Sequence, residues 1–461
     1  MDRIRHRARH CAFAAAILFC ASVACFGTSK DYILYVGTYT TNGSKGIYAY
    51  HYDGNTDRLS PIGLAAETEN PSFLVVDSGS THLYAVNETQ KYRNESSGGL
   101  TAFAIDRKTG MLKQLDEVAS RGADPCFISF DRSGKYLLVA NYTGGNVAVF
   151  PVLADGRIGE ASSVLDDEGV VGPNKERQEK AHAHWIQVSA RNRFAYVSDL
   201  GLDRVLIYNF DATRGKLSRG QPASAKDFLS ATLSPGTGPR HVVFSPDGEF
   251  MYVLGELDST VTVFANDHGE TYRAIQKISA LPQGFSGKND AAEIAVHPNG
   301  KFLYASNRGD DSIVVFAIDG GTGRLTFMQR VPTHGKAPRN FVVSPTGEHL
   351  FAANQDSGNI VEFRIDQTTG RLNAGIQVAS VPSPVCLVFA PVRLSTGLHS
   401  SRIPMRAGST DDLRWAEYAV CAVQECVPDL FNHLFWECQP QLFHHHLQVF
   451  PGFFLLARVA Q

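Results

Sequence analysis

The chain has 461 residues, of which 43% are hydrophobic and 19% charged, and it contains 41 glycines and 21 prolines. This composition argues against a disordered or helical chain and favours a turn-rich protein built from strands. The formal net charge of −3 gives no electrostatic reason to expect a nucleic acid as partner.

Residues 1–28 have the pattern of a secretory signal peptide. Four arginines between positions 3 and 9 precede a mostly apolar run over 11–26. That run is shorter than the ~20 residues that cross a bilayer, so we expect no stable membrane span after signal removal. We predict an exported protein, periplasmic or secreted. The alternatives are a permanent anchor and lipid attachment at Cys25, although Ser22 stands where a lipobox has leucine.

From residue 31 onward the sequence repeats one unit. Each copy has an apolar strand-like run, a turn and an aromatic-rich strand, as in "PCFISFDRSGKYLLVANY" and "EIAVHPNGKFLYASNR". A further apolar strand such as "RVLIYNFD" and a more polar one such as "LTFMQRVPT" complete the unit. Seven such units recur every ~50 residues, which predicts an all-β fold, a seven-bladed β-propeller with four-stranded blades. The second strands close at Thr38, Asn87, Asn141, Asp199, Gly255, Asn307 and Asn354.

The two ends of the repeat complement each other. The segment "ILYVGTYT" at 33–40 matches a second strand but has no first strand before it. The missing strand is found at the other end, as "PVCLVFAP" at 384–391. We therefore predict a propeller over 31–391 in which the N- and C-terminal strands share one blade, which removes exposed sheet edges.

Residues 392–461 continue no repeat. They hold two of the three tryptophans, so we expect an unrelated tail, either from a shifted reading frame or disordered. Metal binding by its cysteines and histidines is conceivable, but no CxxC pair is present and we expect no metal; the residues are Cys421, Cys426, Cys438 and His444 to His446. Only Cys126 and Cys386 lie in the repeat, so the fold is not a disulfide scaffold.

Two residues of each unit meet at one mouth of the central channel, because each first strand starts beside the end of its antiparallel second strand. The start positions are Ser72, Cys126, His184, Arg240, Ala292, Arg339 and Val385. The end positions are Tyr39, Glu88, Tyr142, Leu200, Glu256, Arg308 and Gln355. Charged residues occupy these positions in some units and not in others. This favours a functional cavity over charges that are merely solvated or paired across the channel.

Other polar residues of the repeat have structural interpretations. The asparagines that close second strands are expected to bond neighbouring blades, although Asn307 stays a candidate for contact with substrate. His182 shares a face with His184 in an extended segment, so it either supports the site or replaces His184 as the catalytic histidine. His241 alternates away from Arg240 and is expected to be buried in its blade.

Several motifs, in order, resemble one family. They include "YVGTYT", "AHAHWIQ", "GTGPRHVVFSPDG", "YVLGELDSTVTVF" and "YASNRGDDSIVVF". Over roughly residues 31–391 the chain resembles the seven-bladed propeller lactonases of the 6-phosphogluconolactonase type, and it is similar to the fungal muconate-lactonising propellers. The resemblance implies catalytic roles for His184 (or His182), Arg240, Glu256 and Arg308, with no metal and no cofactor.

The chemistry of lactone hydrolysis agrees with these residues. A water must lose a proton, and donors must face the oxyanion that develops on the ring carbonyl. Glu256 or His184 can act as the base and Arg240 can stabilise the oxyanion. Arg308 and Arg339 offer forked donors for a phosphate or a carboxylate. The residues expected to bind substrate are His182, Arg339, Glu88, Tyr142, Asn307 and Gln355.

The sequence thus predicts a hydrolase that opens the ester of a sugar lactone to the sugar acid. We expect a monomer whose partner is this small molecule, without nucleic acid. One alternative is a muconate-type cycloisomerase, in which Arg240 and Arg308 clamp the carboxylates of a dicarboxylate. The other is a non-catalytic propeller that binds a partner at the same mouth, because fold alone does not set function.

Overall fold

The computed structural model describes residues 30–219, 230–267 and 271–392, all within one unit of the chain, Met1–Leu394. The predicted signal peptide, and the predicted tail from residue 393 onward, lie outside these residues. The described residues form 29 β-strands and one short 3-10 helix, η1 (Thr40–Asn42). No helix among them is long and apolar enough to cross a membrane.

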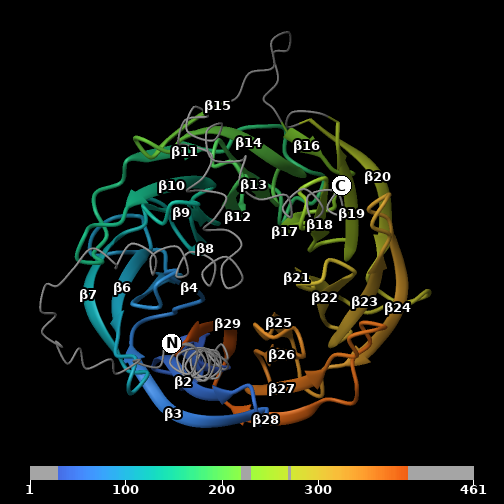
Figure 1. Ribbon diagram of the computed structural model, residues 1–461. Helices are drawn as coiled ribbons and strands as arrows, with labels where there is room; N and C mark the ends of the chain where they lie inside the picture. Colours follow the sequence, from blue (N-terminus) through green and yellow to red (C-terminus); the bar gives the residue numbers. More distant parts are fainter. Residues whose placement is uncertain (1–29, 220–229, 268–270, 393–461) are drawn as a thin grey trace, which may run out of the picture. The chain divides into compact units, whose positions relative to one another are not determined.

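Seven antiparallel sheets follow one another around a ring (Figure 1). The first three that are consecutive in the chain comprise β4 (Phe73–Val76), β5 (His82–Asn87), β6 (Gly99–Ile105) and β7 (Leu112–Ala119); β8 (Pro125–Phe130), β9 (Tyr136–Asn141), β10 (Asn146–Pro151) and β11 (Ser163–Asp166); and β12 (Ala183–Val188), β13 (Phe194–Asp199), β14 (Arg204–Asp211) and β15 (Lys216–Arg219), with β16 (Ser230–Thr232) added. The next three comprise β17 (Pro239–Phe244), β18 (Phe250–Gly255), β19 (Thr260–Asn266) and β20 (Tyr272–Ser279); β21 (Asp290–Val296), β22 (Phe302–Arg308), β23 (Ser312–Ile318) and β24 (Leu325–Pro332); and β25 (Pro338–Val343), β26 (His349–Asn354), β27 (Asn359–Arg364) and β28 (Ile376–Ser380).

The seventh sheet closes the ring with both ends of the described chain. Its order is β29 (Pro384–Pro391), β1 (Asp31–Thr38), β2 (Gly46–Asp53) and β3 (Arg58–Glu67). β29 pairs with β1 antiparallel, with Leu34 opposite Phe389. Inner strands of neighbouring sheets contact each other all the way round, from β4 through β25 and β29 back to β4. The predicted seven-bladed propeller and its shared blade are confirmed.

One blade departs from the four-strand pattern. Its third strand, β14, pairs with β15 along Tyr208–Asp211 and with β16 along Arg204–Leu206. The outer edge of this blade is therefore built from two short strands, which the repeat did not predict.

The inner strands carry a bulge at the mouth of the channel. In β17, Pro239 pairs with Gly255 and Val242 with Val253, so Arg240 and His241 together stand opposite Leu254. Equivalent register shifts fall at Cys126 in β8, at His184 in β12 and in three further inner strands. A bulge inserts one residue and changes the direction of the side chains beside it. In six of the seven blades the start position is therefore a place where strict alternation of side chains fails, whereas β4 pairs with β5 without such a shift.

At the far end of the blades, the same contact between a tyrosine and a glycine recurs at three junctions between neighbouring blades of the described residues. The hydroxyl of Tyr84 donates to the Gly156 carbonyl of the next blade at 2.8 Å, and that of Tyr304 donates to Gly370 at 2.9 Å. Gly370 has a φ of +68°, and a Cβ there would lie 2.3 Å from the Phe302 ring. The turn needs glycine both for its left-handed backbone and for this close approach.

Candidate active site

Two predicted arginines from neighbouring blades converge on one predicted glutamate. Arg240 lies in β17, Glu256 follows β18, and Arg308 ends β22. The Nε of Arg240 is 3.0 Å from Glu256 Oε2, and the Nη2 of Arg308 is 3.1 Å from the same oxygen. Glu256 and Arg240 are both buried. The register argument from the sequence therefore placed these three side chains correctly in space.

A third arginine reaches the same glutamate from outside the repeat. Arg177 lies in the connection between β11 and β12. Its Nη2 donates to Glu256 Oε1 at 2.6 Å and to the Tyr142 hydroxyl at 3.2 Å, and its Nη1 is 3.7 Å from Asp290 Oδ1. Sequence reasoning missed Arg177 because it belongs to no repeated strand. The only signal was an arginine in the polar segment just before the "HAH" motif.

The surrounding charges keep the glutamate ionised. Burial by itself would raise the pKa of Glu256, but Arg308 and Arg240, ahead of the other neighbours, hold it well below 4.5. Burial and the nearby guanidinium group of Arg308 lower the pKa of Arg240 to about 10. At neutral pH both groups are therefore charged, and the carboxylate is a weak base.

His184 completes the cluster. Its Nε2 lies 3.8 Å from Glu256 Oε2, its Nδ1 lies 3.7 Å from Cys126 Sγ, and the Tyr142 ring meets it edge-on. Burial, followed by the charge of Arg240, holds the pKa of His184 well below 6.5. Burial also raises the pKa of the Cys126 thiol. At neutral pH His184 is therefore an uncharged imidazole beside an ionised carboxylate.

The other predicted histidine is engaged elsewhere. The Nδ1 of His182 is 3.1 Å from the Tyr142 carbonyl oxygen, and its Nε2 is 3.0 Å from Glu179 Oε1. Its ring stacks on the Tyr142 ring at 4.5 Å between centroids. His182 supports Tyr142, whereas His184 faces Glu256.

Across the mouth, Arg339 offers a free guanidinium group. Its Cζ lies 5.2 Å from the centre of the Tyr39 ring, and the Tyr39 hydroxyl donates to Glu88 Oε2 at 2.9 Å. Within the described residues, the guanidinium group of Arg339 makes no hydrogen bond or ion pair. Burial lowers the pKa of Arg339, but Tyr39 and Glu88 outweigh burial and raise it above its ordinary value. Arg339 is thus a charged donor that is not used by the fold.

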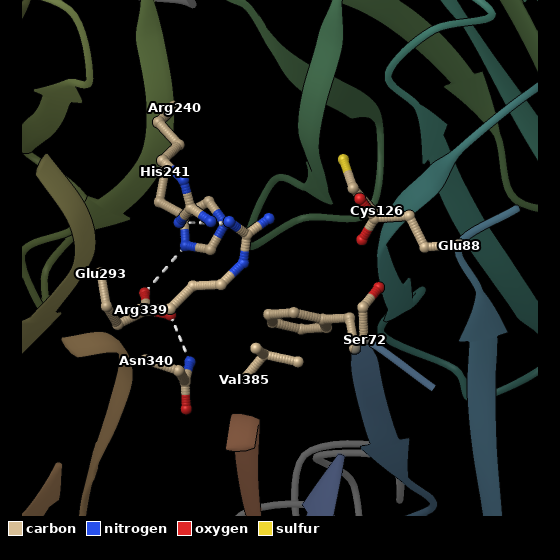
Figure 2. Close-up of a pocket in the computed structure, with 10 residues that line it drawn as sticks. Ser72, Glu88, Cys126, Arg240, His241, Glu293, Arg339, Asn340 and Val385 are labelled. Atoms are coloured by element: carbon tan, nitrogen blue, oxygen red, sulfur yellow. Dashed lines mark hydrogen bonds and ion pairs between the residues drawn. The ribbon is translucent and has the colours of Figure 1, made fainter. Parts of the chain in front are cut away.

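Two cavities share Arg339. A groove of about 370 Å³ is lined by Arg308, Lys288 and Lys336, by the predicted Gln355, and by the carboxylates of Asp290, Asp311 and Asp356. A smaller cavity of about 10 Å³, close to the size of one water, lies among Arg240, His241, Glu293 and Asn340 (Figure 2). The groove has room for a ligand, whereas the smaller cavity does not.

The structure corrects the prediction for His241. The residue is buried, as expected, but it does not point away from Arg240: its Nε2 is 3.2 Å from Arg240 Nη1. The bulge in β17 is the cause, because it removes the alternation on which the prediction rested. Sequence reasoning also missed Glu293 and Asn340. A glutamate within the apolar run "AAEIAV" was the available signal.

Of the two roles predicted for Asn307, the structure shows the bond to the neighbouring blade and not a contact with substrate. Its Nδ2 donates to the Ala280 carbonyl at 3.0 Å, and its Oδ1 accepts from Asn289 at 3.2 Å. The side chain is fully buried within the blade edge. We therefore assign Asn307 a structural role.

The described residues contain no group of three or more His, Cys, Asp or Glu side chains arranged to hold a metal ion. The chemistry that the site can perform with its own groups is acid–base transfer by an imidazole beside a carboxylate, with several guanidinium donors at the same place.

Comparisons with known proteins show the family of the chain. The family model "Lactonase, 7-bladed beta-propeller" matches residues 33–389. The chain is 37% identical over 312 residues to the 6-phosphogluconolactonase of Bacillus subtilis, covering 68% of this chain and 84% of that one. It is 35% identical over 316 residues to the 6-phosphogluconolactonase of Formosa agariphila, covering 67% and 86%. The periplasmic gluconolactonase of Pseudomonas aeruginosa superposes with a TM-score of 0.72 at 35% identity, covering 78% of this chain and 99% of that one.

Proposed function

Because the chain belongs to the seven-bladed β-propeller lactonase family, we propose that it hydrolyses the ester of a sugar lactone to the sugar acid. The observation that supports this most directly is the convergence of Arg240, Arg308 and His184 on the buried carboxylate of Glu256. A site of this kind combines a proton acceptor with fixed donors, which are the two requirements of ester hydrolysis.

We assign the role of base to His184. Glu256 is already paired with Arg177, Arg240 and Arg308, and these charges hold its pKa well below its ordinary value, so its oxygens are poorly available to accept a proton. The imidazole is uncharged at neutral pH and can accept the proton of an attacking water. Glu256 Oε2, at 3.8 Å, then stabilises the imidazolium that forms.

The arginines stabilise the charge that develops on the substrate. As the water attacks, the ring carbonyl oxygen becomes an oxyanion, and Arg240 and Arg308 offer guanidinium donors from two blades. Collapse of the tetrahedral intermediate breaks the ring C–O bond, and the proton on His184 passes to the leaving hydroxyl oxygen. Each such contribution is worth roughly 10² to 10⁴ in rate.

The remaining polar groups bind the rest of the sugar. Arg339, whose guanidinium group makes no hydrogen bond or ion pair within the described residues, suits an anionic or hydroxyl substituent in the groove. Gln355 lines the same groove, and Glu88 and Tyr142 lie at equivalent end positions of other blades. His182 contributes by holding Tyr142.

We also propose that the protein acts outside the cytoplasm. The support is the signal-like pattern of residues 1–28 and the similarity to a periplasmic gluconolactonase. Fractionation of cells that express the full chain would test this, with recovery in the cytoplasm alone as the contrary result.

The central test is an assay of the full chain on D-glucono-1,5-lactone, its 6-phosphate and cis,cis-muconate. We expect ring opening of at least one sugar lactone, with loss of activity in Arg240→Ala. Turnover of muconate alone would favour the cycloisomerase. Turnover of none would favour a binding module and contradict the proposal.

A further inference from the structure

A chain of buried polar side chains leads from the last blade to Arg240. Asn340 Nδ2 donates to Glu293 Oε2 at 2.5 Å. Glu293 Oε1 lies 2.9 Å from His241 Nδ1, and His241 Nε2 lies 3.2 Å from Arg240 Nη1. At the other end, the backbone N–H of Leu387 donates to Asn340 Oδ1 at 2.9 Å. Figure 2 shows the side chains of Arg240, His241, Glu293 and Asn340, which line the smaller cavity. Each link crosses from one blade to another or lies within a bulge.

The direction of every hydrogen bond in this chain is determined by its two ends. The backbone N–H of Leu387 can only donate, so the amide oxygen of Asn340 accepts and its NH₂ group donates to Glu293. The guanidinium group of Arg240 can also only donate, so His241 Nε2 must accept. His241 then carries its proton on Nδ1 and donates it to Glu293, which as a carboxylate accepts from both sides.

The charge states of Glu293 and His241 agree with these donor and acceptor roles. Burial would raise the pKa of Glu293, but His241 and Arg240 outweigh burial and lower it. Burial, which outweighs the opposite effect of Glu293, lowers the pKa of His241. Glu293 is therefore ionised and His241 uncharged at neutral pH, so Nε2 keeps the lone pair that Arg240 needs.

The contacts of Arg240 show what this series of hydrogen bonds does. Its Nη1 is held by His241 and by the Ala292 carbonyl at 2.5 Å, and its Nε faces Glu256. Within the described residues, Nη2 has no hydrogen-bond partner. The guanidinium group is thus fixed on one side while one nitrogen stays free. An oxyanion donor must be held in place before the charge develops, and misplacement by about 1 Å can cost roughly a hundredfold in rate.

We propose that Asn340, Glu293 and His241 are positioning residues that fix Arg240 so that its Nη2 faces the lactone carbonyl oxygen. This inference rests on the proposed lactonase function for its kinetic consequence. Within the described residues, none of the three bonds to Glu256, so they act through Arg240 and are not themselves catalytic.

Two variants of His241 separate its two hydrogen bonds. In His241→Asn, the amide nitrogen replaces Nδ1 and keeps the bond to Glu293, but no acceptor reaches Arg240. In His241→Gln, the amide oxygen replaces Nε2 and keeps an acceptor for Arg240. We expect kcat to fall about tenfold or more in His241→Asn with KM within about twofold. The loss in His241→Gln should be smaller, because this variant keeps the acceptor for Arg240 although it loses the bond to Glu293. The matched control is His297→Gln, which alters a buried histidine that bonds Gly347 at the far end of another blade.

Equal losses in the two His241 variants, or a wild-type kcat in a folded His241→Asn, would overturn the proposal.

A second readout does not depend on activity. In the full chain labelled with ¹⁵N-histidine, the His241 resonances, assigned by their loss in His241→Gln, should show the neutral form protonated on Nδ1. An Nε2-protonated ring or an imidazolium at pH 7 would overturn the positioning chain even if the protein proved inactive on every lactone. If wild type is inactive but the Nδ1 form is found, the proposed function fails and the hydrogen-bond chain stands.

Discussion

The two ends of the propeller blades use the same repeat differently. At the far end, Gly156 and Gly370 form the same contact in different blades. Each has a left-handed backbone, and the carbonyl oxygen of each accepts a hydrogen bond from a tyrosine hydroxyl of the preceding blade. At the mouth, equivalent positions hold Arg240, Ala292 or Val385. Residues that repeat hold blades together, whereas residues that differ at the same register build the site. Substitutions can test this division, with large effects on catalysis at the mouth and effects on stability alone at the far end.

The largest effect is expected at the proposed base. His184→Gln removes the group that accepts the proton of water, so kcat should fall by roughly 10² to 10⁴. The matched variant His182→Gln removes a histidine whose nitrogens bond Tyr142 and Glu179, and its kcat should fall far less. Steady-state kinetics on glucono-1,5-lactone compares the two. A larger loss in His182→Gln would reverse the assignment.

The next effect is expected at the oxyanion donor. Arg240→Ala should lower kcat by about 10² to 10³, the usual cost of one such donor, while the chain stays folded because Arg308 and Arg177 still pair with Glu256. The control is Arg193→Ala, at the far end, where the guanidinium group covers the Phe194 ring and makes no hydrogen bond or ion pair within the described residues. Its kcat should equal that of wild type. Unchanged hydrolysis in Arg240→Ala would remove the basis of the mechanism.

The pH dependence of kcat/KM tests the environment of His184 without any substitution. The imidazole of His184 is active when unprotonated, so activity is constant above its pKa and falls as the pH drops through it. Since burial and Arg240 hold this pKa well below 6.5, the acidic limb of kcat/KM should lie below pH 6.5. Initial rates between pH 4 and 7.5 would locate it. A limb at or above 6.5 would indicate a solvated histidine and contradict the geometry.

The smallest effects on catalysis are expected from substitutions at the far end of the blades. Gly370→Ala forces a left-handed backbone on a residue with a Cβ and presses it against Phe302, so unfolding free energy should fall by about 1–2 kcal/mol or more. Tyr304→Phe removes only the hydroxyl that donates to Gly370 and should cost about 1 kcal/mol. Denaturant unfolding measures both. A change in kcat of the folded protein in either variant would show that the two ends are not separate.

Most of the fold was predictable because its signals are local. Alternation marked the strands, and the spacing of the units counted the blades. The strand missing before "ILYVGTYT" identified β29 as its partner, and the observed pairing agrees. The same register brought Arg240, Glu256 and Arg308 to one mouth.

Periodicity was therefore enough to predict the ring of seven blades and the positions that face its mouth. Which side chains meet there depends on long-range contacts. A bulge turned His241 toward Arg240, and this depends on strand pairing that alternation cannot reveal. Arg177 bonds Glu256 from a connection outside the repeat, and Asn307 bonds the Ala280 carbonyl of the neighbouring blade. These three outcomes depend on contacts between residues distant in sequence, for which a local pattern carries no information.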